Sequence, residues 1–487
     1  MPSRLALFTM FLSILTVLSE PASALQEDTE RYDIVLAGGR VMDPETGLDA
    51  VRYVGIREGR IAAISSMPLV GDTEIDVSGL VVAPGFVDLH AHGQDSVSRR
   101  FQVRDGVTTA LELEGGVGRI SQWYEENEGR SVINFGATIS HGGVRANVLL
   151  SDDGSTPAPY QAADADQLVQ IEAGIRAGLD AGALGIGFGI QYHPASRREE
   201  ILRMFGVAAA YDVTNFVHNR DMGMLEPGGS IDAVQELIAN AAITGASVHL
   251  VHIGSSGLGQ VPLIIEMISG AQRNGVDITT EVYPYTAAST DLSSALFDEG
   301  WRARFEADYD SLEWVATGER LTEETFHQYR QQGGMIIAHM IPEAAVNYAV
   351  AHPLVMIASD GVPYVNGRAH PRGAGSFARV LGRFVREQNT LTLMEALRKM
   401  SLMPARRLEN VVPQMRTKGR LQVGSDADVT VFDPNRVIDR ATFAEPAQFS
   451  DGIVHVLVNG TFVVRDEEII DGVFPGVGIR REPAPIP

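Results

Sequence analysis

The stretch Pro84-Gly85-Phe86-Val87-Asp88-Leu89-His90-Ala91-His92 has the pattern of an apolar β-strand that ends in two histidines. Side chains alternate between the two faces of a strand, so these histidines point the same way and can bind one metal ion. A lone His-x-His is weak evidence, and the rest of the chain decides its meaning. Later apolar runs end in further residues of metal-binding type, namely His218, His252 and Asp360. This distribution predicts a barrel with metal ligands at the C-terminal ends of its strands.

Length and composition are those of a large globular protein. The chain has 487 residues, of which 45% are hydrophobic and 21% charged, and it suits a large α/β domain with an accessory domain. Its formal net charge of −23, without a basic block, argues against nucleic acid or an anionic membrane as a partner. The sequence contains no cysteine, which excludes disulfides and thiolate metal ligands.

Residues 1–24 have the pattern of a secretory signal peptide. Arg4 gives a short positive start, residues 5–18 form an apolar run too short to span a bilayer comfortably, and Ala22-Ser23-Ala24 supplies a cleavage site. An uncleaved N-terminal anchor is the alternative. No other segment is long and apolar enough to span a membrane. We therefore expect a periplasmic or secreted protein.

Short strand patterns flank a long middle of alternating strands and helices. Residues 32–39 and 51–64 near one end, and 428–433 and 453–460 near the other, alternate and turn as short strands do. The simplest packing joins both ends into one small β-sandwich domain, residues 25–83 and 415–487, beside a barrel domain of residues 84–414.

The middle repeats the order strand, then helix. Helical periodicity covers residues 164–181, 231–244 and 261–274. The repeat predicts a (β/α)8 TIM barrel with one irregular extra strand, and a more polar stretch near residues 291–330 predicts a helical insertion over the barrel mouth. The nine strand candidates are residues 86–90, 108–114, 133–138, 184–190, 215–218, 247–252, 278–283, 335–339 and 355–359.

Each candidate ligand follows an apolar run. Asp360 can bind a metal and take a proton from bound water, because a nearby cation lowers the pKa of that water towards 7. A helix N-cap is the alternative role for this aspartate. His249 falls on the opposite face to His252 by alternation, which favours a structural role.

Two metals about 4 Å apart need a bridging anion. No lysine lies near these strands, so a carboxylated lysine is excluded as the bridge. The run Thr108-Thr109-Ala110-Leu111-Glu112-Leu113-Glu114-Gly115 offers two glutamates on one strand face, which are costly to bury without a cation or a hydrogen-bond partner. Glu114, nearer the end of the strand, is the preferred ligand. Otherwise Glu112 is the ligand and Glu114 a partner for a histidine.

Together these residues resemble the amidohydrolase superfamily and, within it, the D-aminoacylase (N-acyl-D-amino-acid deacylase) family. The resemblance covers nearly the whole chain after the signal. The tyrosine-proline-tyrosine block together with His-Pro-Arg is its more specific part. The matching stretches are residues 84–92, 106–109, 140–145 (Ser-His-Gly-Gly-Val-Arg), 182–185, 281–287 (Glu-Val-Tyr-Pro-Tyr-Thr-Ala), 370–373 (His-Pro-Arg-Gly) and 424–428.

The resemblance implies a zinc-dependent hydrolase of C–N bonds other than peptide bonds, with one or two ions. Asp360 would act as general base and pass the proton to the leaving nitrogen, and Tyr283 would donate a hydrogen bond to the developing oxyanion. Guanidinium and hydroxyl groups suit a substrate carboxylate, although structural pairing is the alternative for each. The implied metal ligands are His90, His92, Glu114, His218, His252 and Asp360, and the candidate substrate-binding residues are Arg220, Tyr192, Arg372 and His141, the last of which could instead brace its loop.

Two positions depart from the family pattern. Members typically carry a cysteine ligand just after the second strand, where this chain has Gly115 beside Glu114, which indicates a thiolate replaced by a carboxylate. Members also carry a lysine two positions after the histidine matching His252, thought to hold the substrate's α-carboxylate, and here that position is Gly254.

The leading hypothesis is therefore the deacylation of N-acyl-D-amino acids, with a small molecule as partner. A dipeptidase or a cyclic-amide (dihydroorotase- or hydantoinase-like) hydrolase on the same scaffold is the alternative, because Gly254 removes a fixed charge. A non-catalytic relative would have lost ligands that this chain retains. The sequence leaves a homo-oligomer open and does not fix the substrate side chain, the stereochemistry or the metal count.

Overall fold

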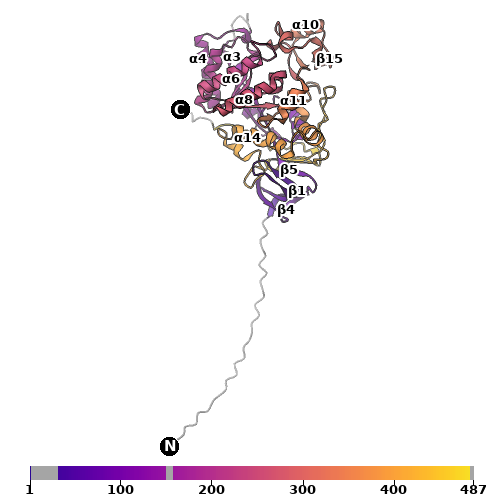
Figure 1. The fold of residues 1–487 in the computed structure, drawn as a ribbon. Helices are drawn as coiled ribbons and strands as arrows, with labels where there is room; N and C mark the ends of the chain where they lie inside the picture. The colour runs from indigo at the N-terminus through magenta and orange to yellow at the C-terminus, as the bar shows by residue number, and fades with distance from the viewer. Residues whose placement is uncertain (2–30, 150–156, 483–487) are drawn as a thin grey trace.

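The computed structural model describes residue 1 and residues 31–149 and 157–482. The signal peptide predicted for residues 1–24 lies, apart from Met1, outside the described residues. A barrel forms most of the molecule, and a β-domain built from β1, β4, β5 and their neighbours lies at one end of it (Figure 1). In the described part of the chain, no helix has the length and apolarity that crossing a membrane requires.

Eight parallel strands form the barrel, in the sheet order β6-β7-β8-β9-β10-β11-β12-β17. The two edge strands meet where Ser359 N donates to Asp88 Oδ1 at 3.0 Å and His92 N donates to Gly361 O at 2.8 Å. Eight of the nine strand candidates are barrel strands. They are β6 (Phe86–Asp88), β7 (Val107–Val117), β8 (Asn134–Ser140), β9 (Gly185–Gly189), β10 (Thr214–His218), β11 (Ser247–Leu250), β12 (Ile278–Val282) and β17 (Val355–Ile357).

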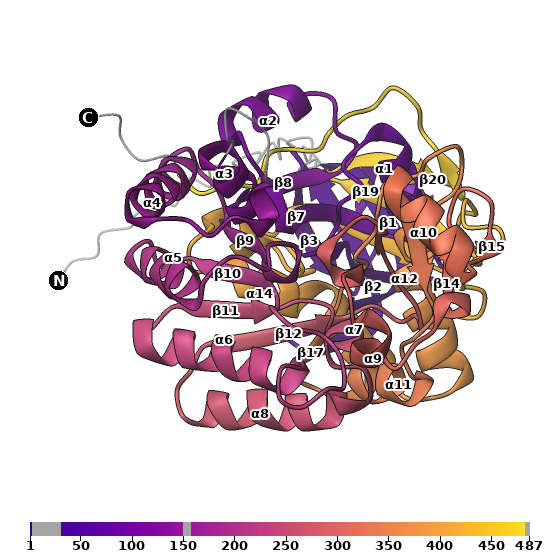
Figure 2. The ribbon, with the colours of Figure 1, turned by 90° about the horizontal axis from the view of Figure 1, so that it is seen from above.

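Helices cover the outside of the barrel, as the view from above shows (Figure 2). The three predicted helices are confirmed as α4, α6 and α8. α4 begins with a capping box, in which Asp164 accepts from Gln167 N and the Gln167 side chain accepts from Asp164 N. The helices are α1 (Ser96–Arg104), α2 (Ile120–Asn127), α3 (His141–Val148), η1 (Ala158–Tyr160), α4 (Ala165–Asp180), η2 (Ile190–Tyr192), α5 (Arg198–Ala210), α6 (Ser230–Thr244), α7 (Ile253–Gly257), η3 (Leu258–Gln260), α8 (Val261–Arg273), α11 (Glu343–Ala351), α12 (Arg372–Arg379), η6 (Val380–Glu387), α13 (Leu393–Leu397), η7 (Arg398–Leu402), α14 (Met403–Leu408) and η8 (Pro413–Thr417).

The insertion between β12 and β17 contains a sheet, so the prediction of a helical insertion is wrong in part. Its antiparallel strands run in the order β13-β16-β14-β15, and the extra strand candidate at residues 335–339 is β16. Short polar strands give little periodicity, and they are stabilised by pairing with β16 from farther along the chain. The elements are β13 (Ala288–Asp291), η4 (Ala295–Phe297), α9 (Trp301–Phe305), η5 (Tyr309–Ser311), β14 (Leu312–Trp314), β15 (Glu319–Arg320), α10 (Glu323–Gln332) and β16 (Met335–Ala338).

Within the described residues, segments 31–84 and 429–469 form one nine-stranded sheet, which β5 and β18 join by antiparallel pairing. The sheet branches at β1, whose first half pairs with β4 and whose second half pairs with β5. The fold class, a TIM barrel with a small β-domain, is confirmed. The strands are β1 (Arg31–Asp43), β2 (Leu48–Arg57), β3 (Arg60–Ser65), β4 (Val70–Asp76), β5 (Val81–Pro84), β18 (Val429–Phe432), β19 (Ile453–Val458), β20 (Thr461–Arg465) and β21 (Glu468–Ile469).

The C-terminal segment returns to the floor of the barrel. Phe135 N donates to Val477 O at 3.1 Å, and Ile479 N donates to Phe135 O at 2.7 Å. Ile479 is fully buried and packs with barrel residues such as Leu111 and Phe216. The floor of the barrel is therefore completed by residues that come long after its last strand.

Candidate metal centre

The C-terminal ends of five barrel strands bring six predicted ligands to one place. Parallel strands have their C-terminal ends at the same rim of a barrel, and each of these residues ends a strand or lies within a few positions of its end. The structure gathers His90 and His92 after β6, Glu114 in β7, His218 in β10, His252 after β11 and Asp360 after β17.

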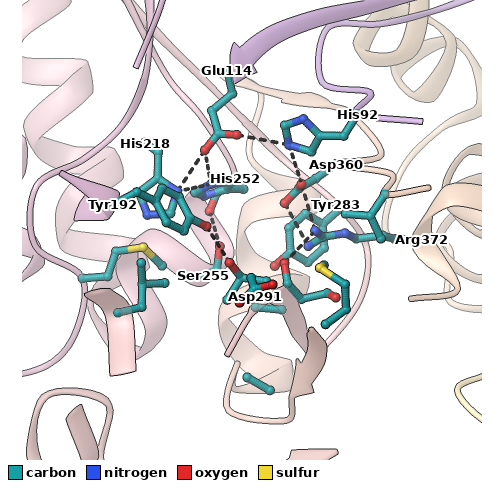
Figure 3. A pocket seen from close by; sticks show the side chains of 18 of the residues that line it. His92, Glu114, Tyr192, His218, His252, Ser255, Tyr283, Asp291, Asp360 and Arg372 are labelled. Carbon is teal, nitrogen blue, oxygen red and sulfur yellow. Dashed lines mark hydrogen bonds and ion pairs between the residues drawn. The ribbon is translucent and has the colours of Figure 1, made fainter. Parts of the chain in front are cut away.

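Glu114 lies between two pairs of histidines, of which Figure 3 shows His92, His218 and His252. Its Oε2 is 3.1 Å from His92 Nε2 and 3.4 Å from His90 Nε2. Its Oε1 is 3.0 Å from His218 Nδ1 and 3.7 Å from His252 Nε2. One carboxylate therefore faces both pairs, which is the geometry of a bridging ligand.

In the first pair, each ring donates its other N–H to a carboxylate. His90 Nδ1 donates to Glu281 Oε1 at 2.7 Å, and His92 Nδ1 donates to Glu112 Oε2 at 2.9 Å. Both Nε2 atoms then carry lone pairs, and they face each other across 3.1 Å. Two lone pairs at this distance repel each other unless a cation lies beside them.

In the second pair, too, each ring donates a hydrogen bond from one nitrogen and has a lone pair on the other. His218 Nε2 donates to Gln191 Oε1 at 3.2 Å. His252 Nδ1 donates at 3.0 Å to the hydroxyl oxygen of Ser256, whose own proton goes to Val251 O. His218 Nδ1 and His252 Nε2 are thus left as acceptors, 3.1 Å apart.

The electrostatics of the cluster favour positive charge between the rings. Burial alone would raise the pKa of Glu114, but where no metal ion lies between the rings, protons on the facing nitrogens of His218, His252, His90 and His92 hold it well below its usual range. Burial also opposes a charge on His92, yet Glu112 and Glu114 raise its pKa to about 10. Four imidazole lone pairs around a shared carboxylate are a donor set that fits divalent metal ions.

The two glutamates of β7 have different surroundings. The pairing of β7 with β8 is irregular between Glu112 and Val117, and this bulge lets Glu114 reach the histidines. Glu112 instead accepts from His92 and from the backbone N–H groups of Gly115 and Gly116. A Cβ at Gly115 would lie 3.2 Å from Glu112 Oε1 and 3.6 Å from the His92 ring, so this position also faces the centre.

Asp360 lies beside the first pair of histidines. Its Oδ1 is 3.4 Å from His90 Nε2 and 3.6 Å from His92 Nε2. Its backbone has φ of +52°, and that of His252 has +35°, a region that costs residues other than glycine energy. Surrounding structure therefore holds two of the six candidate ligands in strained conformations.

Arg372 holds the carboxylate of Asp360. Its guanidinium donates from Nη1 to Oδ2 at 2.8 Å and from Nη2 to Oδ1 at 2.9 Å, and it lies over the ring of Tyr283. The Tyr283 hydroxyl is buried near Ser255 and Arg372 and forms no hydrogen bond with the described residues. Burial raises the pKa of Tyr283 to about 12, so the hydroxyl keeps its proton and can donate it in a hydrogen bond.

A pocket of about 240 Å³ opens onto the centre. Residues of the insertion form much of its wall, and Tyr192 closes one side, with its hydroxyl 2.9 Å from Thr290 Oγ1. The centre is therefore reached through a small cavity between the barrel and the insertion. Its large apolar lining residues are Met222, Leu296, Phe297, Phe305, Met335 and Met340.

Comparisons with known proteins agree with this arrangement. A sequence model of the amidohydrolase family matches residues 163–464. The chain belongs to the amidohydrolase family. N-acyl-D-glutamate deacylase of Alcaligenes xylosoxydans xylosoxydans is 31% identical over 89% of this chain and 94% of its own, and D-aminoacylase of the same organism is 30% identical over 91% and 96%. The crystal structure of N-acyl-D-glutamate deacylase from Bordetella bronchiseptica, complexed with zinc and a phosphonate inhibitor, has a TM-score of 0.81 at 28% identity and covers 93% of this chain and 100% of that one.

Two of the substrate-binding candidates lie outside the pocket of this amidohydrolase. The Arg220 guanidinium is paired with both oxygens of Glu236, at 2.8 and 2.9 Å. His141 is buried and its Nε2 donates to Glu200, which also pairs with Arg145. For both residues the structural alternative holds, because the partners Glu236 and Glu200 are buried. Tyr192 and Arg372 do line the pocket.

The sequence argument missed the residues that orient the ligands of this amidohydrolase. Glu281 lies in β12 and accepts hydrogen bonds from His90 and His249. Gln191 likewise accepts a hydrogen bond from His218 and orients its ring. The role of Glu281 could have been predicted, because a carboxylate inside a barrel strand needs a cation or a hydrogen-bond partner, as do the two glutamates of β7. His249 has the predicted structural role and bonds Glu281 and Thr279. The strand-face argument was wrong, because β11 ends at Leu250, before His252, and His249 points into the barrel against Phe216.

Proposed function

We propose that this amidohydrolase is a zinc enzyme that removes the acyl group from N-acyl-D-amino acids. The observation that carries the proposal is the Glu114 carboxylate between two pairs of histidine lone pairs, with Asp360 and the Tyr283 hydroxyl beside it. The relatives named for N-acyl-D-glutamate and D-amino-acid deacylation support the substrate class.

The donor set offers two sites that share Glu114. His90 and His92, with Asp360 beside them, would hold one ion, and His218 and His252 would hold a second. A bound zinc ion lowers the pKa of a coordinated water towards 7 and polarises a carbonyl group. Loss of Glu281 or Gln191 would loosen a ligand without removing it.

The protein side chains supply the proton transfers of amide hydrolysis. Asp360 takes a proton from the attacking water, whose oxygen forms a bond to the carbonyl carbon. Tyr283 donates a hydrogen bond to the carbonyl oxygen as it gains negative charge. When the C–N bond breaks, Asp360 returns the proton to nitrogen, so the products are an amine and a carboxylic acid. Arg372 orients Asp360 through both carboxylate oxygens.

The pocket favours an apolar amino-acid side chain. Six large apolar residues line it, and among the described lining residues Arg372 is the one Arg or Lys side chain and is paired with Asp360. Gly254 carries no side chain where the family has a lysine, although a Cβ there would make ordinary contact, at 3.4 Å from Val282. A substrate with an acidic side chain would find no free cation in this cavity.

A substrate panel on metal-replete protein tests the proposal. We expect N-acetyl-D-leucine and N-acetyl-D-methionine to be hydrolysed, N-acetyl-D-glutamate more slowly, and the L-enantiomers least. Removing metal with a chelator should abolish hydrolysis, and zinc should restore it. Turnover of hydantoins or dipeptides in place of the N-acetyl compounds would refute deacylation and favour the alternative hydrolase.

We also propose that the protein is exported to the periplasm or secreted. The support is the sequence of the first 24 residues, with one early arginine, an apolar run and Ala22-Ser23-Ala24. N-terminal sequencing of protein recovered from the periplasm or medium should begin at Leu25. An intact N-terminus on membrane-bound protein would indicate the uncleaved anchor instead.

A further inference from the structure

A second cavity adjoins the metal pocket. Its volume is about 310 Å³, and it lies between the insertion sheet and residues 362–369. Ser289, Met335 and Val362 line both cavities, so the two share a wall. The metal pocket, at about 240 Å³, falls below the roughly 300–1,000 Å³ typical of ligand sites. A substrate that extends past this shared wall would have room for a distal group.

The second cavity is apolar on one side and cationic on another. Trp314, Val315 and Met335 come from the insertion, and Val365 and Arg368 come from the facing loop. Trp314 is 5% exposed and stacks on Tyr329 with ring centroids 4.4 Å apart, which makes it a rigid wall. Such walls suit a short aliphatic chain.

Arg368 is the cation of this cavity. Val365 and Arg368 pair across a tight turn in which Asn366 has φ of +51° and Gly367 has +74°, so the turn fixes the position of the arginine. A Cβ at Gly318 would lie 3.4 Å from Arg368 Nη1, which places the guanidinium against the β14–β15 turn.

The guanidinium of Arg368 has no ion-pair or hydrogen-bond partner among the described residues. In contrast, Arg372, four residues on, is bidentate to Asp360, and Arg330 of the insertion is paired with Asp298. A half-buried, unpaired guanidinium beside a catalytic pocket offers a planar fork that matches a carboxylate.

We propose that the second cavity binds a carboxylate at the far end of an extended substrate, through Arg368. The inference rests on the proposed deacylase function, because the scissile amide lies at the metal centre. The carboxylate would end either the acyl group, as in an N-dicarboxylyl amino acid, or the amine product, as in an N-acyl dipeptide. In the first case, the aliphatic chain of the acyl group lies along Trp314 and Met335.

Steady-state kinetics with matched substrates test the subsite. N-adipoyl-D-leucine carries the carboxylate on the acyl side, N-acetyl-D-leucylglycine carries it on the amine side, and N-acetyl-D-leucine ends before the cavity. For whichever extended acid is the better substrate, Arg368→Gln should raise KM about 10-fold or more and leave kcat within about 2-fold. KM for N-acetyl-D-leucine and for the adipoyl monomethyl ester should not change.

Two further variants serve as controls. Arg368→Lys keeps the charge but loses the fork, and should recover part of the affinity. Arg320→Gln, in the insertion but outside both cavities and paired with Glu313, should behave as wild type. Equal KM values for wild type and Arg368→Gln on both extended acids would overturn the proposal.

A binding experiment separates this inference from the proposed function. Adipate monoamide should quench the fluorescence of Trp314 in wild type and about 10-fold more weakly in Arg368→Gln, while hexanamide should not distinguish them. If no N-acyl-D-amino acid is hydrolysed but this difference is seen, the deacylase function fails and the carboxylate subsite stands. Hydrolysis without the difference overturns the subsite alone.

Discussion

At the scale of single residues, the important property of the centre is which nitrogen of each imidazole is free. Glu281, Glu112, Gln191 and Ser256 each accept an N–H on the side away from Glu114. The rings are thereby oriented before any metal arrives, so binding costs little reorganisation. The affinity of the centre for metal ions should therefore depend on these four residues, which orient the rings without binding the metal.

Glu114 and Glu112 form a natural pair for testing this division of roles. Glu114→Gln should lose at least one equivalent of zinc, because the amide supplies one neutral oxygen where the carboxylate faces both pairs. Glu112→Gln should retain both equivalents, with affinity about 10- to 100-fold weaker, because it only orients His92. Metal analysis after dialysis measures both. The opposite pattern would move the bridge to Glu112.

Asp360→Asn tests the proton transfer. The amide cannot accept a proton at neutral pH, so kcat should fall by roughly 10²- to 10⁴-fold while the circular dichroism spectrum and zinc content stay unchanged. Asp277→Asn, which removes an acid just before β12 at the other end of the barrel, is the matched control and should keep its activity. Near-normal turnover by Asp360→Asn would exclude its role as general base.

Sequence reasoning located the candidate ligands but not the residues that orient them. His218 and Asp360 could be predicted because the end of a parallel strand fixes where its side chain points. The contact from His90 to Glu281 spans 191 residues and depends on how neighbouring strands are placed, which no local pattern encodes. Arg220 was misplaced because residue type alone cannot show that Glu236 already neutralises it.

At the scale of elements, η7 beneath the barrel contains a buried lysine that forms no ion pair with the described residues. Lys399 is 2% exposed and donates to the backbone oxygens of His352 and Val355. Burial, reinforced by Arg398, lowers the pKa of Lys399 to about 7. In the unfolded chain a lysine has a pKa of about 10.4, so the folded protein binds this proton less tightly.

The stability of the protein should therefore rise with pH relative to Lys399→Met. Between pH 7 and 10 the unfolded chain binds more protons at this lysine than the folded protein, so rising pH favours folding. From pH 7 to pH 10, the free energy of unfolding of the wild type should rise by roughly 2–4 kcal/mol more than that of the variant. Urea unfolding at a series of pH values measures it, and parallel pH curves would disprove the shift.

Hydrophobic periodicity in the sequence predicts the helices of this protein better than its short strands. The helices with apolar spacing, such as α4 and α6, were predicted close to their observed bounds. The strands β13 and β14 were not, because they have four and three residues and exist through pairing with β16. Local signals identify elements that are stable through local periodicity, while short strands depend on partners distant in sequence.

At the scale of the whole molecule, a buried ion pair within the β-domain is hydrogen-bonded to the barrel. Lys418 donates to Asp428 at 2.7 Å, and Asp428 also accepts from Asn134 at the start of β8. Burial disfavours the charge on Lys418, but Asp428 and Asp426 raise its pKa above the usual value. Each buried charge of the pair is compensated only while the other charge is present.

Lys418→Met should destabilise the protein by about 3–5 kcal/mol, because it leaves the buried Asp428 carboxylate unpaired. The exposed pair of Arg440 and Asp451 provides the comparison, and Arg440→Met should cost less than about 1 kcal/mol. Urea unfolding followed by circular dichroism measures both. Similar small losses in the two variants would show that the buried pair is not needed to compensate Asp428.

The return of Ile479 to the barrel floor has a consequence for the newly made polypeptide. Translation delivers all eight barrel strands before the residue that covers Leu111 and Phe216 from below. During that interval the growing chain presents an uncovered apolar surface, which invites aggregation. We expect a chaperone to shield it on the ribosome, and deletion of residues 475–482 to yield inclusion bodies instead of a weakened enzyme.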